Sequence, residues 1–364
     1  MTAILFVVIL IVVNQMKPAK EGEFHRDYLC KEKTTAINGI FVILIVISHA
    51  KQYIDIGGIY DDAYIAVSTH LNQMVVASFL FYSGYGMMES VKKKKFDYVK
   101  SVMTKRFWIL LINFNLALCL YYVEGRLLGK TYTVKKLILS SFGWESIGNS
   151  SWYVFAILSL YIMFFVAFFI IRFTDNTKIY YVSALFLTLF IIAFVYFEMK
   201  MGRSRYTYNT VILFALGVWW SLLKNIIEKI VMKNDITYLI TVALVLGVYF
   251  PAYFRRWSGG IEGYTVWAIA FTVCMILVTM KISFFNPILS WFGKHVFSIY
   301  ILQRLPMYIF EYLGYNESHK YMFIICSFAV TVVLAVIFDK FTTMISKRLF
   351  GKNIRKKSIV PQSV

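Results

Sequence analysis

Long apolar stretches separated by short charged segments constrain this chain more than any other feature of its sequence. The 364 residues are 59% hydrophobic and 18% aromatic, and their mean hydropathy is +0.66. A soluble domain could not keep so many apolar side chains out of water. Stretches of about 20 apolar residues are long enough to cross the hydrocarbon core of a bilayer as helices. We therefore predict an all-α fold, a polytopic bundle of membrane helices.

Eleven stretches reach or approach this length, which predicts ten core helices and one extra N-terminal helix. The expected spans are 2–16, 35–51, 71–88, 106–124, 152–172, 178–197, 207–224, 236–253, 263–281, 286–303 and 320–342. They divide the chain into an N-terminal helix with its linker (1–33), a membrane domain (34–346) and a basic tail (347–364). The five prolines lie at or outside span ends, so we expect no helix broken in mid-membrane.

The net charge of +19 is spread unevenly over the connecting segments. If these segments alternate between the two sides, with 17–34 cytoplasmic, about twice as many lysines and arginines lie on the cytoplasmic side as outside. This asymmetry predicts an N-terminus outside and a C-terminus in the cytoplasm. The excess of lysine and arginine therefore mainly indicates how the chain is oriented in the membrane. We expect the runs 92–95 and 355–357 to contact anionic lipid, with no role for nucleic acid.

The cysteines and histidines do not form a metal-binding pattern. Cys30, Cys119, Cys274 and Cys326 are scattered, and the sequence has no CxxC motif and no Cys/His cluster. We therefore predict neither a metal site nor a disulfide framework. Four of the five histidines lie in or beside loops or near the start of a span, and we expect them to be structural or interfacial. They are His25, His70, His295 and His319.

The fifth histidine, His49, interrupts the first core span near its outer end, and Asn38 interrupts the same span near its start. In a helix, eleven steps of about 100° bring the two side chains onto one face, about 16 Å apart along the axis. An imidazole inside a membrane helix usually faces the bundle interior and by default indicates function. The alternative is a histidine at the interface that only hydrogen-bonds a neighbour. We therefore predict a functional role for His49, with Asn38 on the same helical face.

Two further motifs lie toward the middle of the chain. The segment 79–86 contains Tyr82 and Ser83 among small residues, which permit close approach of backbones and by themselves indicate ordinary helix packing. Lys105 and Arg106 stand at the expected cytoplasmic mouth of the third core span. There they could bind phosphate or simply anchor the helix.

Three more polar motifs mark the expected outer ends of later spans. Residues 148–153 include Ser150 and Ser151, either of which could cap a helix, followed by Trp152 and Tyr153, which suit a membrane interface. Asn209 lies in a short polar stretch, 208–210. The segment 291–306 places Gln303 and Arg304 at the outer end of the ninth core span.

Taken in order, these motifs resemble the integral-membrane acyltransferase type 3 family, from about Thr34 to Asp339. The resemblance is to the branch that acetylates capsular and other exopolysaccharides in bacteria. It implies a ten-helix core, acyl-CoA (acetyl-CoA by default) as a cytoplasmic co-substrate, no bound cofactor, and His49 as the main catalytic group. A sugar hydroxyl of a glycan or lipid-linked sugar would be the acceptor. The protein would therefore lie in the bacterial cell membrane.

Two positions depart from the family pattern. The family usually has arginine eleven residues before the histidine, where this chain has Asn38, so we expect donor binding to depend on Lys105 and Arg106. A second histidine of the family is replaced by Gln303. An acyl-transfer reaction also needs donors for a developing oxyanion. Asn38 and six pocket residues are candidates for this role or for shaping the pocket: Tyr82, Ser83, Trp152, Tyr153, Asn209 and Gln303.

Two other classes of protein remain as alternatives. A membrane glycosyltransferase using a polyprenyl-phosphate donor would place acidic residues in the first outer loop, where Asp55, Asp61 and Asp62 lie. A pair such as Asp61 and Asp62 is, however, more often a solvated turn. That class leaves His49 unexplained. The second alternative is a transporter of a lipid-linked glycan. Donor dependence distinguishes the three, because only the acyltransferase consumes acyl-CoA.

Overall fold

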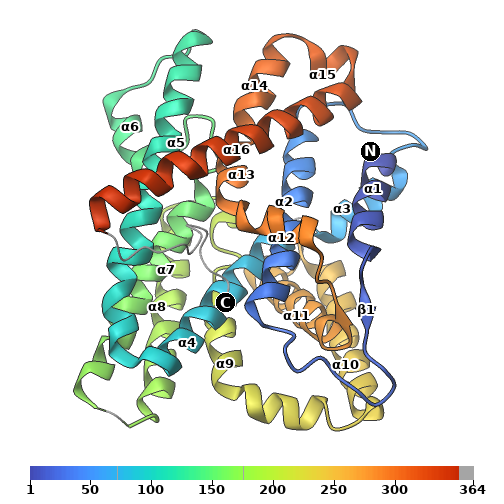
Figure 1. Cartoon of the computed structure of the whole chain (residues 1–364), viewed down its shortest axis with the longest axis vertical. Helices are drawn as coiled ribbons and strands as arrows, with labels where there is room; N and C mark the ends of the chain where they lie inside the picture. Colours follow the sequence, from blue (N-terminus) through green and yellow to red (C-terminus); the bar gives the residue numbers. More distant parts are fainter. Residues whose placement is uncertain (72, 175, 352–364) are drawn as a thin grey trace.

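The computed structural model describes residues 1–71, 73–174 and 176–351, and most of these residues are helical (Figure 1). The helices are α1 (Thr2–Val13), α2 (Lys31–Ala50), α3 (Asp62–Leu71), α4 (Met74–Val102), α5 (Trp108–Leu127), α6 (Val134–Ser141), α7 (Trp152–Phe168), α8 (Ile179–Lys200), α9 (Ile212–Val231), α10 (Asp235–Arg255), α11 (Gly260–Lys281), α12 (Pro287–Lys294), α13 (Val296–Leu302), α14 (Arg304–Tyr312), α15 (Tyr315–Ser318) and α16 (Lys320–Phe350). Short π or 3-10 segments, η1 (Met103–Phe107), η2 (Phe169–Phe173) and η3 (Arg205–Thr207), lie between them. The strands β1 (Lys17–Pro18) and β2 (Ile282–Ser283) form one small antiparallel pair.

The predicted class, a polytopic helical membrane bundle, is confirmed. In the part of the chain that the structure describes, eight helical stretches are long and apolar enough to cross a membrane. The stretch Asp62–Leu127 contains two of the predicted spans, 71–88 and 106–124. The extra N-terminal helix is present as α1, but its 12 residues extend only about 18 Å. This is shorter than the roughly 30 Å hydrocarbon core, so α1 does not match the predicted span 2–16.

The predicted span 286–303 is not one helix, and the expectation that no helix is broken is wrong here. The chain forms α12 and α13, with His295 between them in a non-helical conformation (φ −106°, ψ 12°), and then α14 from Arg304. Pro306 explains the second break. In a continuous helix its ring would collide with the carbonyl of Leu302, four residues earlier. The expected domain boundary at 346 lies inside α16, and tail residues 352–364 lie outside the described part of the chain.

Asp339 of α16 stabilises the first of these breaks, the junction between α12 and α13. Its carboxylate is hydrogen-bonded both to Nδ1 of His295 and to the hydroxyl of Ser298. One acidic side chain therefore joins the α12–α13 junction to the long C-terminal helix. His295 has a structural contact, as the sequence predicted.

Glycine contacts fix the position of α2, the helix that carries His49. A Cβ added to Gly39 would lie 1.9 Å from the carbonyl oxygen of Leu289, and one added to Gly293 would lie 1.8 Å from the carbonyl oxygen of Thr35. Real Cβ atoms cannot approach backbone so closely, so α2 and α12 touch through these two glycines. Gly84 of α4 and Gly217 of α9 make a second contact of this kind, as small residues in the segment 79–86 indicate.

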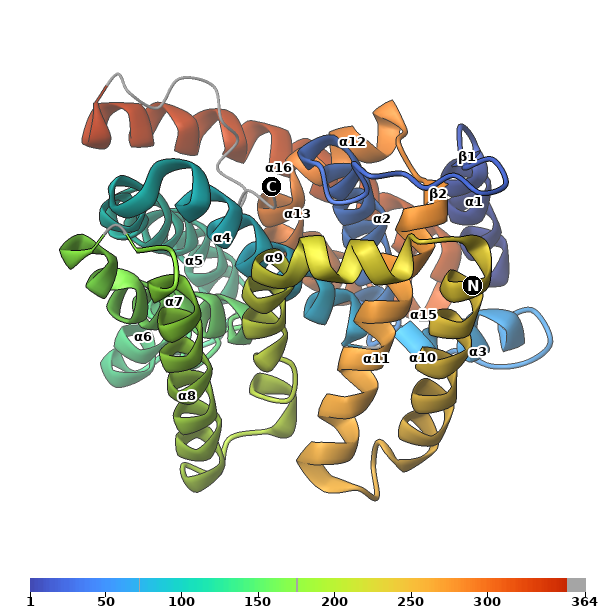
Figure 2. The same ribbon diagram turned by 90° about the horizontal axis from the view of Figure 1, so that it is seen from below.

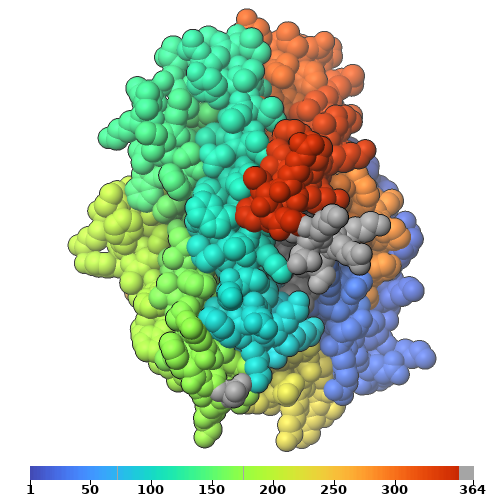
Figure 3. Space-filling view, turned by 60° about the vertical axis from the view of Figure 1, so that its left-hand side comes forward, coloured from blue at the N-terminus to red at the C-terminus, as the bar shows by residue number. Residues whose placement is uncertain are grey.

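The remaining helices are arranged around these contacts. The consecutive helices α10 and α11 form a packed pair, and α7 and α8 form another (Figure 2). The C-terminal helix α16 is packed against α13 and α14 and also contacts α2. On the face shown in Figure 3, the red end of α16 lies beside the teal residues of α4 and α5. Segments from the two ends of the sequence thus meet around α2.

Candidate active site

His49 lies one residue before the end of α2 and opens on a cavity of about 730 Å³. Its ring is partly exposed to this cavity, whereas Nδ1 is buried and has no hydrogen-bond partner among the described residues. The cavity is formed by residues of several helices and of the segments beside them. The helices are α1, α2, α3, α4, α7, α11, α13 and α14, and the segments follow α2 and precede α7, α9 and α11. The sequence-based expectation that His49 faces the interior of the bundle agrees with this position.

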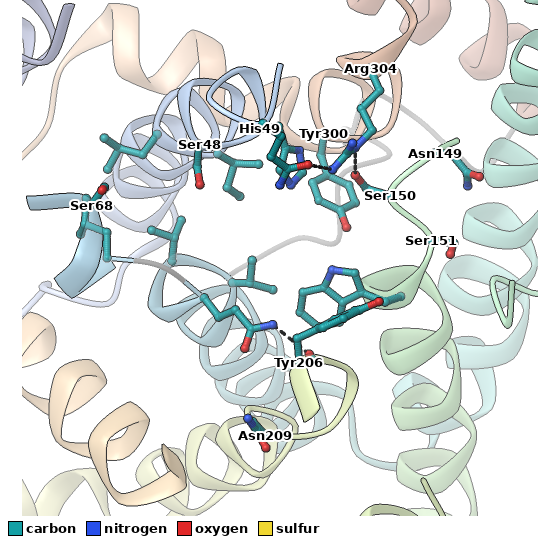
Figure 4. Close-up of a pocket in the computed structure, with 18 of the residues that line it drawn as sticks. Ser48, His49, Ser68, Asn149, Ser150, Ser151, Tyr206, Asn209, Tyr300 and Arg304 are labelled. Carbon is teal, nitrogen blue, oxygen red and sulfur yellow. Dashed lines mark hydrogen bonds between the residues drawn. The ribbon is translucent and has the colours of Figure 1, made fainter. Parts of the chain in front are cut away.

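Arg304 lies next to His49 in the cavity wall (Figure 4). Its guanidinium donates three hydrogen bonds, from Nε to Oγ of Ser150 (3.2 Å), from Nη1 to the hydroxyl of Tyr53 (3.0 Å), and from Nη2 to Oε1 of Gln52 (2.8 Å). These bonds connect the start of α14 with the segments that follow α2 and precede α7. Ser150 therefore accepts from arginine instead of capping a helix. Ser151 stands at the N-cap of α7 but makes no side-chain cap bond.

A row of aromatic rings extends from His49 into the bundle. The ring centroids of His49 and Tyr300 are 6.5 Å apart, and those of Tyr300 and Tyr153 are 5.7 Å apart. Gln303 is fully buried and lies close to the imidazole of His49. The Nε2 group of Gln303 donates to the carbonyl of Tyr300, while Oε1 has no partner among the described residues. Two predicted pocket residues, Tyr153 and Gln303, thus belong to the surroundings of His49.

The opposite side of the cavity is rich in aromatic side chains. Trp152 and Tyr206 pack edge to face with centroids 6.0 Å apart, and Trp257 lies 5.6 Å from Tyr264. Gln73 connects these two pairs, because its amide donates to the carbonyl of Tyr206 and accepts from the hydroxyl of Tyr264, both at 3.0 Å. Aromatic surfaces with a few fixed polar groups are typical of small-molecule sites.

Asn209 completes this wall and is one of the residues predicted for the pocket. Its side chain is almost fully buried, and Oδ1 has no hydrogen-bond partner among the described residues. An unpartnered buried amide oxygen is energetically costly unless a ligand or water supplies a donor. The cavity lining therefore includes three predicted residues directly: His49, Trp152 and Asn209.

Three other predicted site residues do not line this cavity. Asn38 is buried nearer the other end of α2, as the helical spacing requires. Tyr82 and Ser83 are buried within α4. None of these three side chains lines the cavity, so their predicted roles in the site stay predictions.

The two predicted donor-binding residues lie on η1, a π-helical turn between α4 and α5. Such turns are uncommon and frequent at functional sites. Lys105 is exposed, whereas Arg106 turns inward, with its guanidinium 5.7 Å from the ring centre of Tyr98. The preceding helix bends at Lys95, which has a positive φ of 48°. Lys105 and Arg106 are therefore placed away from the His49 cavity.

Several cavity residues were not predicted as part of the site. Tyr300 and Arg304 belong to a segment that the sequence singled out, but only Gln303 was selected from it. Tyr206, Trp257 and Tyr264 were not selected at all. The sequence could have indicated them only by their position. These aromatic residues lie in or next to segments on the same predicted side of the membrane as His49.

Of the acidic pair that suggested a glycosyltransferase, Asp62 is exposed and Asp61 is bonded to other parts of the chain. Asp61 is fully buried, and so it is not part of a solvated turn. Its carboxylate forms ion pairs with the amino group of Met1 (2.5 Å) and with Lys320 (3.0 Å), and it accepts a hydrogen bond from the amide of Gly57. The bond from the amino group and the neighbouring charges lower the pKa of Asp61 below its usual range. Asp61 does not line the cavity.

The fold and the site define a polytopic membrane protein with one histidine exposed to a large aromatic and polar cavity. A family model described as an acyltransferase domain matches residues 35–340, which is most of the chain. The chain therefore belongs to the acyltransferase type 3 family and is a membrane acyltransferase. No curated protein and no solved structure shows significant similarity to it.

Proposed function

We propose that this membrane acyltransferase transfers an acetyl group from acetyl-CoA to a sugar hydroxyl of an exported or cell-envelope glycan in bacteria. The observation that carries this proposal is the position of His49, whose imidazole opens on a cavity lined by Trp152, Tyr206, Trp257 and Tyr264. Aromatic faces suit the apolar faces of sugar rings, and the surrounding amides and hydroxyls suit sugar hydroxyl groups. Glycan acceptors account for both kinds of lining.

Two chemical routes fit a histidine in this position. As a general base, His49 takes the proton of a sugar hydroxyl, whose oxygen attacks the thioester carbonyl, and CoA then leaves as a thiol after receiving a proton. As a nucleophile, the imidazole first forms an acyl-histidine and releases CoA, and the sugar hydroxyl then displaces the imidazole. In either route a negative charge develops on the carbonyl oxygen and requires hydrogen-bond donors. The amide of Gln303 is the predicted candidate that lies beside His49.

The proposal is tested by reconstituting the purified protein in lipid vesicles with acetyl-CoA that carries a labelled acetyl group. Surface glycans from cells lacking the protein serve as acceptors. We expect alkali-labile label to enter the glycan and free CoA to appear in equal amount. Transfer of sugar without use of acetyl-CoA would instead indicate a glycosyltransferase, and transport without chemical change would indicate a carrier.

We further propose that the Lys31 end of α2 faces the cytoplasm and the His49 end faces outward. The segments that contribute to the cavity, around residues 52, 146–151, 205–206 and 257, are those that the alternating topology assigns to the outside. Single cysteines labelled in intact cells with a membrane-impermeant reagent test this. We expect labelling at Ile59 and at Leu127, which are exposed, and protection at Lys93. Labelling of Lys93→Cys from outside would contradict the topology.

Lys105 is expected to contribute to the binding of acetyl-CoA, whose phosphates need compensating charge. Lys105→Ala should raise the KM for acetyl-CoA about tenfold with little change in kcat, because a charge-assisted hydrogen bond to phosphate is lost. Lys100→Ala is the matched control, since Lys100 is also exposed and precedes η1 on α4. An unchanged KM in Lys105→Ala, or an equal change in the control, would show that Lys105 only anchors the helix.

A further inference from the structure

The fixed charges that line the His49 cavity are all positive. Among the residues that line it are two arginines, Arg304 and Arg205, and no aspartate or glutamate. All other lining side chains are neutral or, in the case of His49, titratable. Charged side chains that line a cavity with poorly polarizable walls concentrate ligands of the opposite sign. A cavity built only for neutral sugar would not need two fixed positive charges.

Arg304 has only neutral partners. Its three hydrogen bonds go to the hydroxyls of Ser150 and Tyr53 and to the amide oxygen of Gln52, and no carboxylate of the described residues forms an ion pair with it. The side chain is partly buried. A guanidinium withdrawn from water loses hydration free energy that neutral acceptors recover only in part. An anion bound in the cavity would supply the missing countercharge.

Arg205 is the second positive charge and lies on η3, far along the chain from Arg304. It is exposed, and no described residue forms an ion pair or side-chain hydrogen bond with it. The next residue, Tyr206, stands on the wall opposite Arg304 in Figure 4. Arg205 therefore adds positive charge on the side of the cavity away from Arg304, where an approaching ligand would meet it.

We propose that the acceptor is an anionic glycan, whose carboxylate or phosphate binds Arg304 and thereby places a nearby hydroxyl at His49. This inference rests on the proposed function and adds the chemical class of the acceptor. A planar guanidinium can bind either anion through paired hydrogen bonds. Arg205, which is exposed, contributes long-range attraction that affects the rate of association more than the bound geometry.

The test uses surface glycans from cells lacking the protein, separated by anion exchange into retained and unretained fractions. Both fractions are incubated with the vesicle-reconstituted protein and labelled acetyl-CoA. We expect at least tenfold more label per sugar in the retained, anionic fraction. Equal labelling, or label in the unretained fraction alone, would overturn the inference and leave the proposed function intact. Absence of label from both fractions would contradict the proposed function itself.

Chemical treatment of the retained fraction identifies the anion. In one arm the carboxyl groups are reduced to alcohols with carbodiimide and borohydride, and in the other phosphate is removed with aqueous hydrofluoric acid. We expect one of these treatments to raise the KM for the glycan about tenfold or more. If neither treatment changes the KM, the anion of the acceptor is not recognised and the inference is wrong.

Variants of the two arginines test whether these residues recognise the anion of the glycan. Arg304→Gln should raise the KM for the untreated anionic glycan about 10- to 100-fold, and Arg304→Lys should retain part of the affinity. Arg205→Gln should reduce labelling mainly at low ionic strength. Arg255→Gln is the control, because Arg255 is exposed but does not line the cavity. An equal loss with treated and untreated glycan in Arg304→Gln, or a rise only in the KM for acetyl-CoA, would contradict binding of an acceptor anion.

Discussion

Substitution of His49 with glutamine is expected to abolish acyl transfer while the protein remains in the membrane at a normal level. Glutamine is similar in size to histidine and keeps some hydrogen-bonding capacity, so it preserves much of the packing at the end of α2. It cannot accept a proton near neutral pH, and it cannot form an acyl intermediate. Loss of general base or nucleophilic catalysis lowers rates by about 10²- to 10⁴-fold or more.

The measurement is the rate of acetyl transfer per molecule of folded protein. His319→Gln is the matched control, because His319 is exposed and outside the cavity, and it should behave like the wild type. A structural role for His49 predicts the reverse pattern for the variant, with low protein yield and normal turnover of the surviving molecules. Turnover of His49→Gln within a few-fold of the wild type would refute the assignment.

A large loss of stability is expected from a substitution at the glycine contact between α4 and α9. In Gly217→Ala the new Cβ would lie 2.1 Å from the carbonyl oxygen of Phe81 and 2.7 Å from the amide nitrogen of Tyr85. Both are backbone atoms of α4, so the two helices must separate. Overpacking of this kind costs about 1–3 kcal/mol, and more where the backbone cannot move. We expect a large loss of folded protein in the membrane.

Gly247→Ala provides the matched control for this substitution. Gly247 lies within α10, and no atom would come within 4 Å of a Cβ placed there. Alanine favours the helix by up to about 1 kcal/mol relative to glycine, so this variant should be as stable as the wild type or more stable. Thermal unfolding in detergent compares the two. Equal stability of Gly217→Ala and Gly247→Ala would contradict the close contact of α4 and α9.

The class of fold could be predicted from hydropathy because each membrane helix must carry its own apolar stretch. Spans such as 35–51 and 263–281 were predicted correctly, because each corresponds to one long apolar helix. The prediction failed for 286–303, because apolar composition does not show where a helix breaks. There the break depends on Pro306 within the chain and on Asp339, which reaches His295 from another helix.

The central residue of the site could be predicted, but most of its surroundings could not. His49 was recognisable because a polar, titratable side chain inside an apolar helix is costly and therefore informative. Arg304 and Tyr206 are ordinary residues for a membrane interface, and only the folded chain shows that they lie around the same cavity. Asn38 lies on the same helix as His49, but it is eleven residues earlier along the helix axis and does not reach the cavity.

Acetylation of a glycan by His49 is tested most directly by mass spectrometry of surface glycans from cells that lack this protein. The cells are complemented with either the wild-type chain or His49→Gln, at matched levels of membrane protein. We expect the wild type to add the mass of one acetyl group to a sugar of the glycan repeat and His49→Gln to add none. Glycans of identical mass with and without the wild-type protein, or full acetylation by His49→Gln, would contradict this expectation.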